Sequence, residues 1–195
     1  ELLQTVATKD ADKIGAFFKA NPESTRQGAW LKDRALPASY ASTNYYSVHA
    51  FTLTNADGKS QLVKWKVVPA DGEQTLSDDD AKGKAADFYT PELKERLAKG
   101  PANFTLNAVL GQAGDPDDDP TALWPDDRKM VAMGTLSIAA LEDQATCDAG
   151  MFDPTNVTDG IEGPKNDGIY QGGVLQNGWD AGVGNVWLPT ATLTY

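Results

Sequence analysis

Apolar positions recur at helical spacing over the first part of the chain. This spacing predicts two short helices over residues 10–20 and 23–34, separated by Pro22, because proline cannot continue a helix. Residues 77–99 show helical character again, with Ser77 as an N-cap in front of three aspartates. The helical segments are therefore short and lie on both sides of a stretch with a different period.

The stretch between these helices alternates between apolar and polar positions. Over residues 44–69 it predicts a β-hairpin, with a turn at Gly58. In the second arm Val63, Trp65 and Val67 alternate with two lysines, so one face of the hairpin packs in the core and the other meets water.

Two further alternating segments, residues 102–111 and 129–138, predict two more strands. The loop between them, residues 114–127, is too rich in proline and aspartate to be regular. After residue 150 the chain becomes irregular, and residues 186–195 have the β-branched content of one additional strand. The pattern as a whole predicts an α+β fold with an antiparallel sheet.

The charge of the chain limits its partners. A net charge of −11 over 195 residues argues against nucleic acid and against anionic membrane surfaces. It favours solubility, with solvation of the surface as the preferred interpretation and a small neutral or cationic substrate as the alternative. No apolar run approaches the length of a membrane span, so we expect a soluble protein. With Cys147 as the single cysteine there is no internal disulfide, and the compartment, periplasmic or secreted among others, stays open.

Most motif-based chemistry is disfavoured. His49 is the single histidine, which removes multi-histidine zinc and copper sites. A Ser–His–Asp triad lacks a nucleophile elbow, because Ser47 lies two residues away on the same predicted strand. The aspartate runs 78–80 and 117–119 lack the spacing of a calcium loop, and a helix N-terminus and a solvated loop explain them better. No pair of carboxylates stands out by spacing, although a hydrolase using carboxylates remains an alternative.

Alternation places His49 on the apolar face of the first strand of the hairpin, together with Phe51 and Leu53. An inward histidine is most often a hydrogen-bonded core residue. The alternative is a supporting role beside a cofactor.

Three segments of this chain resemble the catalase family. They are residues 39–74, which contain the hairpin; residues 119–138, which begin Asp-Pro-Thr and continue through a Trp-Pro pair; and residues 152–167, which begin Phe-Asp-Pro and contain Asp-Gly-Ile-Glu. The chain looks most like the small catalase-related haem peroxidases, and the resemblance covers roughly residues 1–167. We therefore treat residues 1–167 as one catalase-like region and residues 168–195 as a divergent segment rich in Gly, Trp and Thr.

The resemblance implies an antiparallel β-barrel with packed helices, a haem cofactor, and hydrogen peroxide as substrate together with a small organic donor. In the family a tyrosine phenolate binds the iron, an arginine supports the tyrosine, and a histidine supports the arginine. His49 lies at the position of that histidine, and Asp167 at the position of an aspartate in the same network. Continued without a gap, the resemblance places Gly173 at the arginine and Asn177 at the tyrosine.

Tyr170 is the nearby phenol that can substitute as iron ligand, so the expected site consists of Tyr170, His49 and Asp167. About four strands are predicted where the family has eight, and a half-barrel of this kind exposes strand edges and an apolar face. We therefore expect a homo-oligomer or a further partner segment that covers them. The alternative function is a haem-free module of the same fold that pairs through its exposed sheet.

Overall fold

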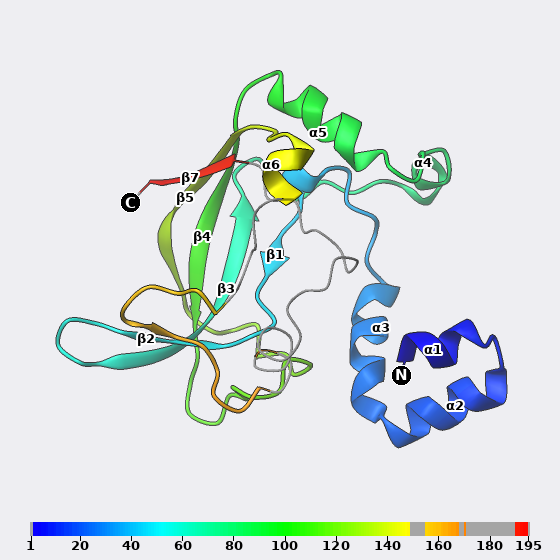
Figure 1. The fold of residues 1–195 in the computed structure, drawn as a ribbon, viewed down its shortest axis with the longest axis horizontal. Coiled ribbons are helices and arrows are strands. Elements are labelled where there is room, and N and C mark those ends of the chain that lie inside the picture. The colour runs from blue at the N-terminus through cyan, green and yellow to red at the C-terminus, as the bar shows by residue number, and fades with distance from the viewer. Residues whose placement is uncertain (1, 149–154, 168–169, 171–189, 195) are drawn as a thin grey trace. The chain divides into compact units, whose positions relative to one another are not determined.

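The structure, a computed structural model, describes residues 2–148, 155–167, 170 and 190–194. The chain divides into two compact units, residues 1–35 and residues 36–195. Figure 1 shows helices in the first unit and a sheet with short helices in the second. Among the described residues, no helix has the length and apolar character needed to cross a membrane.

The first unit is helical throughout. It contains α1 (Leu2–Ala7), α2 (Ala11–Ala20), the 3₁₀ turn η1 (Pro22–Ser24) and α3 (Thr25–Lys32). Asp10 caps α2, since its carboxylate accepts hydrogen bonds from the backbone N–H groups of Asp12 and Lys13 at 3.1 and 3.2 Å. The two predicted helices are confirmed, and the second one opens with the 3₁₀ turn that starts at Pro22.

In the second unit, the described residues form seven strands of one antiparallel sheet. They are β1 (Tyr45–Tyr46), β2 (Phe51–Thr54), β3 (Ser60–Pro69), β4 (Ala102–Leu110), β5 (Met130–Ala140), β6 (Ile161–Glu162) and β7 (Thr190–Thr194). The strand order is β6-β2-β3-β4-β5-β7, and β1 pairs with β3 beside β2. Figure 1 shows β3, β4 and β5 as long curved neighbours. The α+β class and the predicted antiparallel sheet are confirmed.

Short helices accompany the sheet. They are the 3₁₀ turn η2 (Tyr40–Ser42), α4 (Asp78–Lys82), α5 (Tyr89–Leu97) and α6 (Gln144–Asp148). The predicted cap of α4 is present, because the Ser77 hydroxyl oxygen accepts a hydrogen bond from the Asp80 N–H at 3.1 Å. Leu93 of α5 packs with Ala102 and Phe104, where β4 begins. One end of the sheet is thus closed by a helix.

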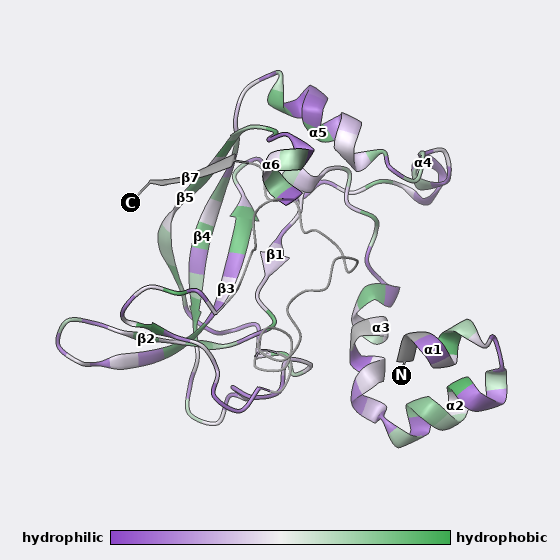
Figure 2. Ribbon diagram, viewed as in Figure 1, coloured by the Kyte–Doolittle hydropathy of each residue, from purple (hydrophilic) through white to green (hydrophobic). Residues whose placement is uncertain are grey.

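A second core cluster lies farther along the sheet. Val63 and Ala108 come from β3 and β4, Phe51 comes from β2, and Tyr170 packs with them. Val63 is fully buried, as the alternation along the second arm of the hairpin predicts. Figure 2 shows the hydrophobic residues along β4 and β5 and the hydrophilic turn between β2 and β3. Because Tyr170 belongs to this cluster, the candidate site described below lies on this part of the sheet.

The far edge of the described sheet is completed by β7, whose backbone pairs with β5 in a register that sets Leu193 opposite Leu136. A strand predicted within residues 186–195 is therefore confirmed for Thr190–Thr194. The pairing of β4 with β5 shifts register between Leu106 and Asn107, which is the local irregularity of a β-bulge.

Candidate functional site

His49 lies in a bend that interrupts the first arm of the hairpin. β1 ends at Tyr46 and β2 begins at Phe51, so the predicted single arm is two strands. Ser47 holds the bend onto β3: its hydroxyl accepts the Trp65 N–H at 2.7 Å and donates to the His49 carbonyl at 3.0 Å. Ser47 therefore serves the backbone and is not paired with the His49 ring as a nucleophile would be.

Asp167 reaches His49 because β6 returns to the edge of the hairpin. Thr52 of β2 pairs with Glu162 of β6, and Asp167 follows five residues later. One carboxylate oxygen, Oδ2, lies 2.6 Å from His49 Nδ1, across 118 residues of sequence. The Asp167 residue is 1% exposed, so the pair is shielded from solvent on the aspartate side.

Tyr170 completes the cluster. Its backbone N–H donates to the other Asp167 oxygen, Oδ1, at 3.0 Å. Its ring lies edge-on to His49 and to Phe51, with centroids 5.2 and 5.9 Å away. The phenol end of the ring packs against Gly163, which has no side chain there. The structure thus brings together all three residues that the sequence selects.

The arrangement fixes which ring nitrogen of His49 is available. When Nδ1 donates its proton to Asp167, a neutral ring presents Nε2 as an acceptor, whereas a protonated ring presents an N–H there. A carboxylate in this position sets the tautomer and the orientation of an imidazole. The cluster can therefore hold a defined proton donor or acceptor next to a buried phenol.

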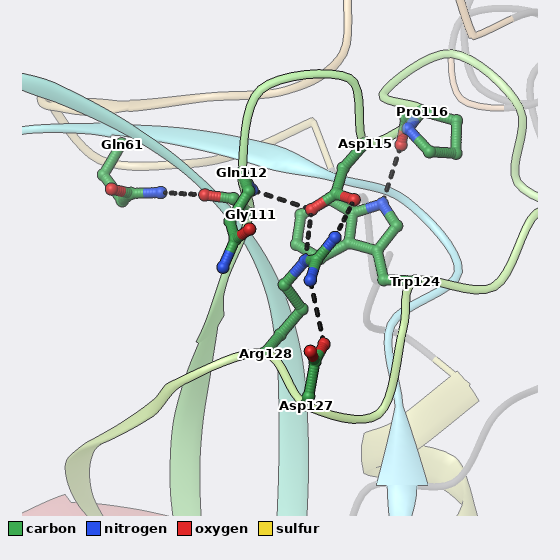
Figure 3. A network of polar contacts seen from close by, with 8 residues as sticks. All are labelled: Gln61, Gly111, Gln112, Asp115, Pro116, Trp124, Asp127 and Arg128. Atoms are coloured by element: carbon green, nitrogen blue, oxygen red, sulfur yellow. Dashed lines mark hydrogen bonds and ion pairs between the residues drawn. The ribbon is translucent and has the colours of Figure 1, made fainter.

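A second polar network orders the loop between β4 and β5 (Figure 3). Asp115 accepts two hydrogen bonds from Arg128, through Nε and Nη2, both at 2.8 Å. It also accepts the Gln112 backbone N–H at 2.7 Å. In the same loop the Trp124 indole N–H donates to the Pro116 carbonyl at 2.8 Å. The predicted irregular loop is therefore irregular in backbone but firmly held.

Burial and ion pairing shift two pKa values in this region. The hydrogen bonds from Arg128, reinforced by the Gln112 N–H, lower the pKa of Asp115 from its ordinary 3.8 to about 2. Burial lowers the pKa of Lys64, and Asp119, Asp167 and Asp115 partly oppose that shift. The Lys64 ammonium donates to the Ala122 carbonyl at 3.1 Å and lies 5.3 Å from the centre of the Trp124 ring.

A hollow of about 290 Å³ adjoins the cluster. Its floor includes Thr52 and Leu62, which face each other across β2 and β3. Its lining also carries charged and polar groups, from the loop between β4 and β5 and from β6 and the residues that follow it: Asp117, Asp118, Glu162, Lys165 and Asn166. Gly163 belongs both to this lining and to the contact with Tyr170.

Sequence reasoning did not select three of the residues that build this region. From the sequence Ser47 is weighed only as a nucleophile, Gly163 only marks irregular chain, and Arg128 has no predicted role. The presence of Arg128 after an aspartate-rich loop was the available signal for an ion pair. Gly173 and Asn177, which the resemblance places at the arginine and tyrosine positions, lie outside the described residues.

Solved structures share this fold. A fungal catalase superposes with a TM-score of 0.71 at 23% identity, over 84% of this chain and 35% of its own. Catalase A of Saccharomyces cerevisiae gives a TM-score of 0.71 at 21% identity, over 84% and 36%. The antiparallel half-barrel with its helices is thus the catalase fold.

The family model described as Catalase matches residues 4–176, and the chain belongs to the catalase family. The catalase-related peroxidase of Synechococcus elongatus is 39% identical over 86% of this chain and 50% of that protein. The catalase-related peroxidase of Mycolicibacterium paratuberculosis is 40% identical over 70% of this chain and 44% of that protein. The chain spans about half the length of these curated relatives.

Proteins of the catalase family generally bind haem, whose iron needs a protein donor atom. Among the described residues, no cluster of three or more His, Cys, Asp or Glu side chains can hold a metal ion. An iron at this place would therefore depend on the phenol of Tyr170, which is 7% exposed. A phenolate is a ligand that haem iron accepts, and an imidazole–carboxylate pair lies beside it. The chemical types of these groups, a phenol with an imidazole–carboxylate pair beside it, are therefore compatible with haem.

Proposed function

We propose that this chain is the part of a catalase-related peroxidase that supports its haem iron, in an enzyme that decomposes hydrogen peroxide or uses it to oxidise a small organic donor. The observation that carries the proposal is the meeting of half-buried His49 with buried Asp167 and Tyr170 in one cluster. The similarity to two catalase-related peroxidases supports the same function.

In this proposal Tyr170 is the iron ligand, and haem, when bound, supplies the redox chemistry with peroxide. Asp167 fixes both the imidazole of His49 and the backbone of Tyr170, so it positions the phenol. His49 holds a proton at a defined ring nitrogen beside the phenol ring. A second copy of the chain or a further segment would cover the open sheet.

Titration of the purified chain with hemin tests the proposal. We expect one equivalent of hemin to give a Soret band that differs from free hemin, and peroxide to decay faster than with the same amount of free hemin. Tyr170→Phe removes only the phenol oxygen and should abolish the altered band. The matched control is Tyr46→Phe, because Tyr46 is 47% exposed and lies on β1.

A spectrum equal to that of free hemin for the unaltered chain would reject haem binding by this chain. An altered band that Tyr170→Phe leaves unchanged would reject Tyr170 as the ligand and keep the family assignment.

A further inference from the structure

We propose that Gly163 is a positioning residue for Tyr170: the missing side chain at residue 163 forms the slot that the phenol ring fills. That this slot positions an iron ligand rests on the proposed function, in which Tyr170 binds the haem iron. That Gly163 makes room for the Tyr170 ring does not depend on haem.

The slot follows from the register of β2 and β6. Thr52 pairs with Glu162, and the antiparallel pairing therefore places the next residue, Gly163, beside Phe51. Neighbouring strands bring directly opposed Cβ atoms to about 5 Å of each other, so a side chain at residue 163 would stand next to the Phe51 ring. Tyr170 occupies that place, since its ring is edge-on to Phe51 and buried.

A methyl group at residue 163 would overlap the Tyr170 ring at Cε1, Cζ and the phenol oxygen. The ring has little freedom to move away. Its backbone is tied to Asp167, and the rings of His49 and Phe51 lie against it. An added side chain must therefore displace the phenol end of the ring or open the strand β6.

The backbone at Gly163 does not itself require glycine. Its φ lies outside the left-handed region, unlike that of Gly160 with φ of 83° in the turn just before β6. Any effect of Gly163→Ala then comes from the contact with Tyr170. Gly83→Ala is the control in the same unit, because a Cβ at Gly83 would make only ordinary van der Waals contacts, the nearest at 3.6 Å, and its φ of −83° also lies outside the left-handed region.

The first experiment is a double-mutant cycle in urea with Gly163→Ala and Tyr170→Leu. We expect Gly163→Ala to lower the urea midpoint by roughly 1 M in the Tyr170 background. In the Tyr170→Leu background the same change should have little effect, because the shorter side chain leaves room for the methyl group. If Gly163→Ala alone does not fold, recovery of folding in the double variant supports the slot.

Nitration with tetranitromethane, mapped by mass spectrometry, then reports the phenol itself. We expect Tyr170 to react on the order of ten times faster in Gly163→Ala than in the unaltered chain, while the exposed Tyr46 reacts equally in both. Equal nitration of Tyr170, or an equal midpoint loss in both backgrounds, would overturn the proposal. Both readouts are independent of hemin, so they remain decisive even if the chain binds none.

Discussion

Two buried aspartates in the sheet unit have opposite kinds of partners. Asp115 is bound by Arg128 and Gln112, which lie within 13 residues of it along the chain. Asp167 binds His49, 118 residues away, and the backbone of Tyr170. The first carboxylate closes a loop, whereas the second joins separate segments and orients two rings that can do chemistry. A buried carboxylate thus indicates a site by the groups that it holds in place, more than by its burial.

Of the changes that test this comparison, Asp167→Ala should lower the free energy of unfolding most, because it removes the acceptor for both the His49 ring and the Tyr170 N–H. Breaking a buried polar pair of this kind costs roughly 3–5 kcal/mol in the free energy of unfolding. Urea denaturation followed by circular dichroism measures this loss. The control is Asp117→Ala at an exposed position, and a loss no larger than that of the control would show that Asp167 does not join the segments.

Asp115 should dominate the response of the loop to acid. Its pKa is about 2 in the folded chain and near 3.8 ordinarily, so the unfolded chain binds the proton first as pH falls. The stability from this pair is complete above pH 4 and is lost between about pH 4 and pH 2. Thermal midpoints at pH 5, 3 and 2 should fall less steeply in Asp115→Asn.

The control for the acid series is Asp71→Asn, since Asp71 pairs with Arg96 but its side chain is 65% exposed. Parallel pH profiles for the unaltered chain and Asp115→Asn would contradict the assignment.

Asp167→Asn should leave the fold in place and change the state of His49. The amide can present its NH₂ group toward Nδ1, which then becomes the acceptor, so the ring proton should move to Nε2. Because the chain has one histidine, ¹⁵N-labelled imidazole gives a single pair of ring signals to follow. An unchanged pair of ring signals would mean that Asp167 does not set the tautomer.

The smallest effect is expected from Lys64→Met, which removes an ammonium near both carboxylates. It loses the hydrogen bond to Ala122 and the contact with Trp124, about 1 kcal/mol in the free energy of unfolding. Lys59→Met in the exposed turn is the control. If Lys64→Met and Lys59→Met lower the free energy of unfolding equally, then Lys64 does not help to hold the loop between β4 and β5 on the sheet. That role would belong to Asp115 and Arg128.

Much of the fold was predictable because it depends on local patterns. Alternation located β3, β4 and β5, and Ser77 and Pro22 marked helix boundaries. The bend at His49 was not predictable, since it depends on Ser47 bonding to β3 across the hairpin. The three site residues followed from the resemblance to the catalase family, and their meeting could not be derived from residue spacing. Gly163 was missed because a slot is visible only when the ring that fills it is placed.

The order of the strands has a consequence for how the chain folds. β2, β3, β4 and β5 pair with their sequence neighbours, and such near contacts form early. β6 pairs with β2 although the two strands are separated by about a hundred residues of sequence, so the loop-closure entropy must be lost before this contact can form. Asp167 follows β6 and is placed at the same step. We therefore expect the His49–Asp167 contact to be among the last native contacts to form. A chain arrested before that closure would show a nearly complete sheet by circular dichroism while its site is still absent.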